Sequence, residues 1–135
     1  MRTMTPTESA YVAGIIDGEG SIEFKRKPRI RRDRTGAPTY VTLIVRMEVP
    51  QVDGRLIDYL METTKEGSRD MKHYPNNESW QDQHRWRCGY HAVYRILKQI
   101  YRYLIVKKEK AKLVIDHYDK QFKKKTYGKG GFGAK

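Results

Sequence analysis

Two acids, Asp17 and Glu19, alternate with two glycines at the end of an apolar segment, in the order Asp17-Gly18-Glu19-Gly20. Carboxylate and backbone carbonyl oxygens suit Mg²⁺, which keeps much of its water and also takes phosphate oxygens. Acids at the end of a helix oppose the helix dipole, and a divalent cation would offset that repulsion. The pattern therefore indicates a divalent-metal site, although acids at helix ends are more often solvated or paired with a nearby lysine or arginine.

The segment before these acids has the features of a helix. We expect Thr5 to be the N-cap, Pro6 the first helical residue and Glu8 the third position of a capping box. The helix is expected to run to about Gly18. Because it is apolar on nearly all sides, it should be buried on more than one side.

Ala10, Gly14 and Gly18 recur every four residues and leave one stripe of this helix without bulky side chains. Another helix can approach such a stripe very closely, a packing best known from membrane dimers. A second copy of the chain and a helix of the same chain are both candidates for that neighbour. With a second copy, two Glu19 carboxylates would face each other, which is the layout for metal-assisted hydrolysis of two phosphodiesters.

The charge of the chain points to a polyanionic partner. It has 28 lysines and arginines against 16 acids, a net charge of +12. Such an excess favours nucleic acid first and an anionic membrane surface second, through release of counterions. The charge is unevenly placed, because residues 25–34 read KRKPRIRRDR and residues 120–135 contain no acid. This weakens the alternative of a protein that is merely basic.

The composition argues against several classes of protein. No apolar stretch is long enough to span a bilayer, so we expect no membrane partner. The N-terminus lacks the apolar core of a signal peptide, and we expect an intracellular, non-secreted protein. The single cysteine, Cys88, cannot form an intrachain disulfide and is expected to be a small buried residue.

Hydrophobic periodicity predicts an α+β chain. Strands are expected near residues 21–29, 39–49, 68–74 and 80–90, and further helices near 52–63, 92–103 and 108–122. Residues 33–38 and 75–77 are expected to be a loop and a turn, and Pro50 is expected to end the second strand. We divide the chain into a single domain, residues 1–122, and a basic Gly- and Lys-rich tail, residues 123–135.

The strands should form an antiparallel sheet with an apolar face under the helices and a polar, cation-rich face. A twisted ribbon of this kind can enter the major groove of DNA. An ordinary sandwich with a solvated outer face is the alternative. His84 is a further candidate for DNA contact, whereas His91 is expected to begin a helix, and Trp80 and Trp86 are expected in the core. The residues expected to contact DNA are Lys25, Lys27, Arg29, Thr42, Arg46, Lys72, Tyr74, Arg85 and Arg87.

Residues 12–20, VAGIIDGEG, followed by Ser21 and Ile22, resemble the signature of the LAGLIDADG homing endonucleases. Five positions agree with the name motif, and the final acid is Glu19 where that motif has aspartate. The single copy resembles the single-motif branch, whose members work as homodimers on nearly palindromic sites. The resemblance covers about residues 7–118. It implies the αββαββα homing-endonuclease fold, with an antiparallel four-stranded saddle for DNA and helices on the opposite face.

The resemblance also implies roles for individual residues. Glu19 and the Gly18 carbonyl would be ligands of Mg²⁺, with Mn²⁺ or Ca²⁺ able to occupy the same site. Asp17 would cap and lock the paired helix ends. The catalytic residues would be Glu19, Gln51, Arg55 and Lys107, with Lys108 as the alternative to Lys107. Solvated cations are the alternative for Arg55 and Lys107. The expected dimer contacts are Ala10, Ala13, Gly14, Asp17 and Gly18.

The implied activity is that of an intron-homing, site-specific endonuclease. It would hydrolyse both strands of a long, near-palindromic DNA site in a metal-dependent reaction and leave short 3′ overhangs. Two alternatives share the fold: an RNA-splicing maturase, with intron RNA as a partner, and a sequence-specific DNA-binding protein that does not cut. A basic protein that coats nucleic acid without sequence preference is a third alternative.

Overall fold

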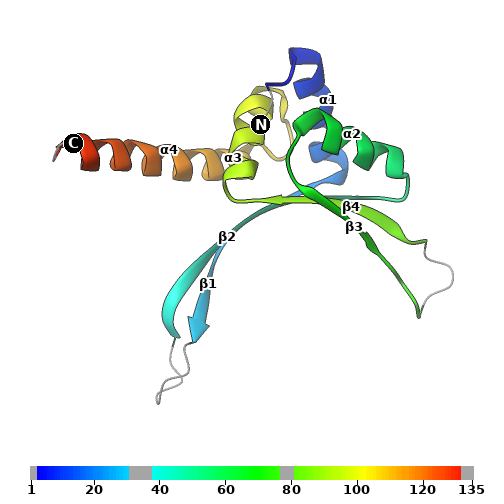
Figure 1. Cartoon of the computed structure of the whole chain (residues 1–135), viewed down its shortest axis with the longest axis horizontal. Coiled ribbons are helices and arrows are strands. Elements are labelled where there is room, and N and C mark those ends of the chain that lie inside the picture. The colour runs from blue at the N-terminus through cyan, green and yellow to red at the C-terminus, as the bar shows by residue number, and fades with distance from the viewer. Residues whose placement is uncertain (1–2, 31–37, 77–80, 132–135) are drawn as a thin grey trace.

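Four antiparallel strands form an arch, and helices lie on its convex side in the computed structural model (Figure 1). The structure describes residues 3–30, 38–76 and 81–131. The elements follow in the order α1 (Pro6–Glu19), β1 (Ser21–Ile30), β2 (Pro38–Gln51), α2 (Gly54–Thr64), β3 (Ser68–Lys72), β4 (Gln83–Gly89), α3 (His91–Ile100), η1 (Tyr101–Tyr103) and α4 (Lys108–Gly131). This order confirms the predicted α+β architecture.

The strands lie in the order β1-β2-β4-β3, so the two hairpins meet at β2 and β4 in the middle of the sheet. The prediction that Pro50 ends its strand was wrong, because β2 continues to Gln51. Pairing between β1 and β2 begins at Ser21 and Glu48, so beyond Glu48 the strand β2 has β4 as its neighbour. A proline has no N–H for the ladder, and it is tolerated where one side of the strand carries no partner.

Helix α1 begins as predicted. The Thr5 hydroxyl accepts the backbone N–H of Glu8 at 3.1 Å, and the Glu8 carboxylate accepts the backbone N–H of Thr5 at 2.9 Å. One side of the helix is buried, through Ser9, Val12, Ala13, Ile15 and Ile16. The other side is open to solvent, so burial on more than one side is not found within a single chain.

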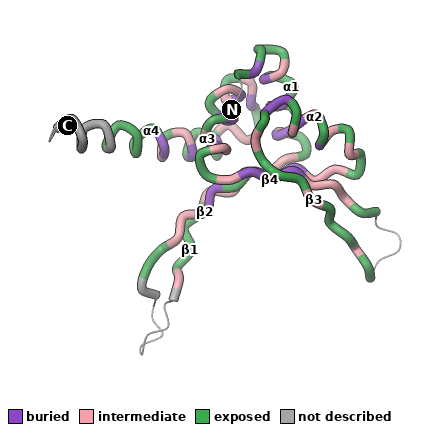
Figure 2. Tube along the Cα trace, viewed as in Figure 1, coloured by how far each residue is buried: buried purple, intermediate pink, exposed green. Residues whose placement is uncertain are grey.

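The core lies between the helices and the convex face of the sheet (Figure 2). Trp86, Met47 and Val49 of the central strands are fully buried there, and Cys88 is buried beside them. Gly67 has a left-handed φ of 88°, and a Cβ at this position would lie 2.6 Å from Nε1 of Trp86. The close approach lets Trp86 donate its indole N–H to the carbonyl of Glu66 at 3.0 Å.

Helix α4 leaves the helical layer and extends beyond it (Figure 1). Its inner side packs on β1, where the rings of Phe24 and His117 meet edge to face at 5.6 Å. The helix continues to Gly131, past the boundary expected after Phe122. The predicted loop at 33–37, Asn77 and Trp80 lie outside the described residues. No helix in the described parts of the chain is long and apolar enough to cross a membrane.

Candidate nucleic-acid interface and metal centre

The carboxylate of Asp17 organises the turn that leads into α4. It accepts the backbone N–H groups of Ile105 at 2.8 Å, Val106 at 3.2 Å and Lys107 at 3.1 Å. A charged acceptor satisfies N–H groups at a turn better than a neutral one. Asp17 was expected to lock two paired helix ends, and in the structure it ties α1 to α4 within one chain.

The side chain of Lys107 also contacts Asp17. Its ammonium group donates a hydrogen bond of 2.9 Å to the backbone carbonyl of Asp17, at the last turn of α1. A cation at the C-terminal end of a helix is favoured by the helix dipole. Lys107 is half-buried there, whereas the alternative, Lys108, places its ammonium 4.9 Å from the ring centroid of Tyr101. The structure therefore brings Lys107 to the end of α1 and turns Lys108 toward an aromatic ring.

Glu19, two residues beyond Asp17, is exposed, and its carboxylate has no hydrogen-bond or ion-pair partner within the described residues. No group of three or more His, Cys, Asp or Glu side chains that could hold a metal occurs in the described part of the chain. One free carboxylate with a neighbouring backbone carbonyl does not make a closed metal cage. It does fit a hydrated Mg²⁺, which takes one or two carboxylates together with phosphate oxygens.

The small-residue stripe of α1 lies on the open side of the helix. Ala10, Gly14 and Gly18 are exposed, and a Cβ built on Gly14 or Gly18 meets nothing within 4 Å. No helix of the described chain therefore fills the groove. Ala13 is different, because it is completely buried among residues of its own chain. Ala13 was expected to contact a second copy of the chain, and this expectation is corrected because a fully buried side chain offers no surface to a partner.

Gln51 and Arg55 line a surface cleft of about 770 Å³ beside the first half of α1, together with Thr7 and Tyr11. Gln51 Oε1 accepts the N–H groups of Val52 at 2.9 Å and Asp53 at 3.4 Å. Arg55 is bound to Asp53, with 2.6 Å between Nη2 and Oδ2. This contact lowers the pKa of Asp53 to about 2.

Glu19 stands at the far end of α1 from Tyr11, about 12 Å along the helix axis at 1.5 Å per residue. Within one chain, Arg55 therefore lies in the cleft with Asp53 and Tyr11, whereas Lys107 lies at the end of α1.

The concave side of the sheet carries polar side chains in register, and we call it the polar face. Cross-strand neighbours share a face. Glu23 pairs with Arg46, Lys27 with Thr42, and Asp70 with Arg85. All nine residues predicted to contact DNA belong to this face or continue it. Its members are Glu23, Lys25, Lys27, Arg29, Thr42, Arg46, Glu48, Ser68, Asp70, Lys72, Tyr74, Gln83, Arg85 and Arg87.

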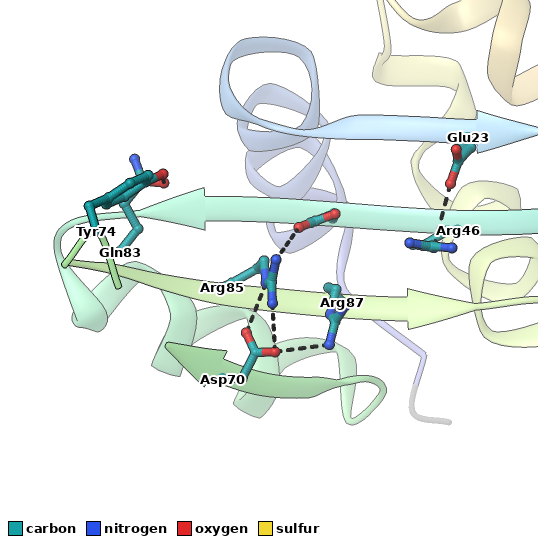
Figure 3. Close-up of polar contacts among 8 residues, drawn as sticks. Glu23, Arg46, Asp70, Tyr74, Gln83, Arg85 and Arg87 are labelled. Atoms are coloured by element: carbon teal, nitrogen blue, oxygen red, sulfur yellow. Dashed lines mark hydrogen bonds and ion pairs between the residues drawn. The ribbon is translucent and has the colours of Figure 1, made fainter. Parts of the chain in front are cut away.

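Acids are interleaved with the cations of the polar face (Figure 3). Glu23 pairs with Lys25 at 2.8 Å and with Arg46 at 3.5 Å. Asp70 binds both Arg85 and Arg87, each at 2.9 Å. At the far end of β3, Tyr74 donates its hydroxyl to Gln83 at 3.2 Å. Several cations of the polar face are therefore held by acids in two ion-paired groups, one around Glu23 and one around Asp70.

His84, the further candidate for DNA contact, lies on the face of the sheet opposite the polar face. It pairs with Gln51 and Met71, so it alternates with Arg85 and lies on the helix side of the sheet. Its Nδ1 is 3.1 Å from Arg69 Nη2, and a Cβ on Gly54 would lie 2.9 Å from its ring. In contrast, Trp86 is in the core and His91 begins α3, as predicted.

Asp70 and Lys110 of the candidate interface were not singled out from the sequence. Asp70 has the same two-residue spacing as Ser68 and Lys72, and that period could have placed it on the polar face. Lys110 lines two adjoining surface hollows, one shared with Lys107 and the other with Lys25 and Arg46. No short-range pattern marks Lys110, because the hollows form only when α4 meets the start of β1.

No family model matches this chain, and no curated protein matches it in sequence. Solved structures do match. The homing endonuclease I-CvuI in complex with its target has a TM-score of 0.64 and 18% identity, over 91% of this chain and 73% of that one. The archaeal intron-encoded homing endonuclease I-Vdi141I in complex with DNA has a TM-score of 0.59 and 17% identity, over 82% and 65%.

The group I intron-encoded homing endonuclease I-CeuI in complex with DNA has a TM-score of 0.60 and 13% identity, over 95% of this chain and 61% of that one. A LAGLIDADG homing endonuclease, I-LtrWI, bound to target DNA, matches with a TM-score of 0.57 and 16% identity, over 91% and 40%. This chain has the homing-endonuclease fold.

The homing-endonuclease fold accounts for the arched sheet with its helices on one side, as predicted. The chain spans 61% to 65% of the I-CeuI and I-Vdi141I chains. The polar face is the concave surface of this arched sheet. Helix α1 ends at Glu19, next to the start of β1 at Ser21.

Proposed function

We propose that this chain is a site-specific DNA endonuclease of the single-motif LAGLIDADG type. It acts as a homodimer on a long, near-palindromic duplex and leaves short 3′ overhangs. The observation that carries the proposal is the pairing of Lys107 with the Asp17 carbonyl, two residues from the unpartnered Glu19 carboxylate. This contact places a cation at the last turn of α1, two residues before Glu19, an acid with no hydrogen-bond or ion-pair partner among the described residues.

The polar face supports duplex DNA as the substrate. Arginine and lysine on a twisted ribbon can address guanine O6 and N7 in the major groove, and other cations can hold phosphates. The neighbours described as complexes with DNA have this same fold. Sequence would be read by Lys25, Lys27, Arg29, Thr42, Arg46, Lys72, Tyr74, Arg85 and Arg87.

The donor set at the end of α1 supports a divalent metal. Glu19 and the Gly18 carbonyl would hold Mg²⁺, and Mn²⁺ or Ca²⁺ offers the same oxygen chemistry. One I-CvuI complex was obtained in the presence of 2 mM Mg and another in the presence of 2 mM Ca. When bound, Mg²⁺ would supply Lewis acidity and offset the negative charge of the reacting phosphate.

The remaining residues act through position and charge. Lys107 places a positive charge where negative charge develops on the phosphate oxygens, and its hydrogen bond to Asp17 keeps the ammonium in place. Gln51 is held at the end of β2 by two backbone N–H groups, which suits a side chain that orients water. Arg55, already paired with Asp53, would act by holding phosphate or water.

A second copy of the chain completes this site. The exposed stripe of Ala10, Gly14 and Gly18 has room for a close helix, and one copy offers a single Glu19 carboxylate. Pairing two α1 helices along the stripe would bring two such acids together and align one site with each DNA strand.

The test is cleavage of a library of near-palindromic duplexes by the purified protein, with Mg²⁺ and with EDTA. We expect double-strand cuts at one recovered sequence in Mg²⁺ alone. Glu19→Gln should abolish cutting while retaining binding to the recovered duplex. Glu62→Gln, which changes an exposed acid on α2, is the matched control and should cut normally.

Sequence-specific binding without cutting, unchanged by Glu19→Gln, would overturn the nuclease proposal in favour of a DNA-binding protein. Salt-sensitive binding without sequence preference would favour a protein that coats nucleic acid. Preference for structured intron RNA over duplex DNA, measured by competition, would favour a maturase.

A further inference from the structure

Arg85 stands at the centre of the polar face and is held from two sides (Figure 3). From the edge strand β3, Asp70 accepts its Nε at 2.9 Å and its Nη2 at 2.9 Å, a bidentate contact. From β2, Glu48 lies 3.4 Å from its Nη1. Bidentate geometry restrains a guanidinium more than a single contact does. Arg85 is therefore the most constrained cation of the described polar face.

Asp70 also binds a second arginine. Its Oδ2 accepts Arg87 Nη2 at 2.9 Å, so one carboxylate joins two neighbouring guanidinium groups of β4. The Arg85 side chain is 23% exposed and that of Asp70 is 38% exposed. The contact with Arg85 keeps the pKa of the Asp70 carboxyl below its usual range, so the group stays ionised at neutral pH. The three residues therefore form one ion-paired cluster, which we call the Asp70 cluster.

A carboxylate on a surface that meets phosphates repels its partner. Removing this charge alone would strengthen general attraction to a polyanion. The acid is nevertheless central to the polar face, where it orders two arginines. A guanidinium carries five N–H donors, and three of those of Arg85 face Asp70 and Glu48. Two donors remain, the number that a bidentate contact to guanine requires.

We infer that Asp70 is a positioning residue for DNA recognition, which fixes Arg85 and Arg87 so that their remaining donors read base edges and not phosphates. The inference rests on the proposed DNA-binding function. Asp70 would lower the affinity of the polar face for DNA of any sequence and raise its discrimination between sequences. Arginines free of Asp70 would reach phosphates of any sequence.

The experiment compares wild type with Asp70→Asn, which keeps the size of the side chain and removes its charge. Bound duplexes are selected from a randomised duplex library, and affinities are measured for the recovered duplex and for its scrambled sequence. For Asp70→Asn we expect about tenfold or more loss of discrimination between the two duplexes. We expect a few-fold tighter binding to the scrambled duplex, with a salt dependence steeper by about one unit of slope.

The positions that lose preference decide between positioning and a general effect. They should be the same base pairs that lose preference in Arg85→Ala and Arg87→Ala. Asp70→Glu retains the charge and should restore part of the discrimination. Asp58→Asn is the matched control, because Asp58 of α2 pairs with Arg69 on the helix side of the sheet. It makes the same charge change away from the polar face and should leave discrimination unaltered.

Retained discrimination in Asp70→Asn, with the circular dichroism of the folded protein, would overturn the inference. Loss of preference at base pairs unrelated to Arg85 and Arg87 would also overturn it, because Asp70 would then read bases itself. If the wild-type protein shows no sequence preference, the proposed function fails together with the inference. A wild-type preference that Asp70→Asn preserves removes the inference and leaves the proposed function standing.

Discussion

Asp17 and Lys107 hold each other by two hydrogen bonds. The Lys107 ammonium donates to the carbonyl of Asp17 at 2.9 Å, and the Asp17 carboxylate accepts the backbone N–H of Lys107 at 3.1 Å. The residues lie 90 positions apart in the chain. This reciprocal contact joins the end of α1 to the start of α4. It makes the location of the lysine depend on the aspartate.

Replacing Asp17 with alanine should lower both stability and cleavage. Three backbone N–H groups would lose a charged acceptor, and such losses cost about 2–4 kcal/mol together. The free energy of unfolding in urea measures the first effect, and single-turnover cleavage measures the second. Asp116→Ala removes an exposed acid that pairs with Lys112 on α4, and should change neither quantity. Full stability in Asp17→Ala would show that the three N–H contacts are dispensable.

Replacing Lys107 with methionine should slow cleavage with little change in binding. Methionine keeps the length and apolar body of the side chain and removes the charge that faces the phosphate. Losing one such electrostatic contact lowers the rate about 100- to 1,000-fold. Single-turnover cleavage and equilibrium binding of the same duplex separate the two effects. The companion Lys108→Met should cut at nearly the wild-type rate, since this side chain lies over Tyr101. The opposite ranking would transfer the role to Lys108.

Replacing Gly14 with leucine should separate the two copies of the chain while each copy remains folded. A Cβ at Gly14 meets nothing within 4 Å, so the larger residue has space within one chain. Leucine also favours helix over glycine by about 1 kcal/mol. Analytical ultracentrifugation should show a dimer for wild type and a monomer for the variant. The control is Lys112→Leu, which adds leucine to an exposed position of α4. A monomeric wild type, with and without DNA, would contradict the prediction.

Acidification should destabilise the contact between α4 and β1 through His117. Nε2 of this histidine is buried without a partner in the described chain. Burial, helped by the charge of Arg26, holds the pKa of His117 below its ordinary value of 6.5. The unfolded chain therefore binds the proton first. The contribution of neutral His117 to the free energy of unfolding is fully present above the ordinary histidine pKa. It declines as the pH falls from that pKa through the lower pKa of His117 in the folded chain.

Urea unfolding at about pH 7.5 and about pH 5.5 measures this decline on both sides of the ordinary histidine pKa. His117→Phe keeps an aromatic ring against Phe24 and should flatten the decline over this window. His73→Gln changes an exposed histidine of the second hairpin, paired with Asp82, and should keep it. An equal decline in His117→Phe would assign the pH dependence to other groups.

The sequence by itself determined the local elements and the faces that they present. The capping box at Thr5 and Glu8, the alternation of strand residues and the buried character of Trp86 follow from contacts or periodicities within a few residues. The nine cations and polar residues expected on one face share it because the side chains of a strand alternate with period two. Asp70 follows the same period.

Tertiary structure alone decided which of these residues work together. The contact of Lys107 with Asp17 and the sharing of Asp70 by Arg85 and Arg87 join residues that are 15 to 90 positions apart. Sequence periodicity reports the face of an element but not which element lies against it. The same limit applies to Ala13, which shares its helix with the open stripe and is buried by packing against neighbouring elements of its own chain. His84 is different, because the strand period alone could have placed it on the face opposite Arg85.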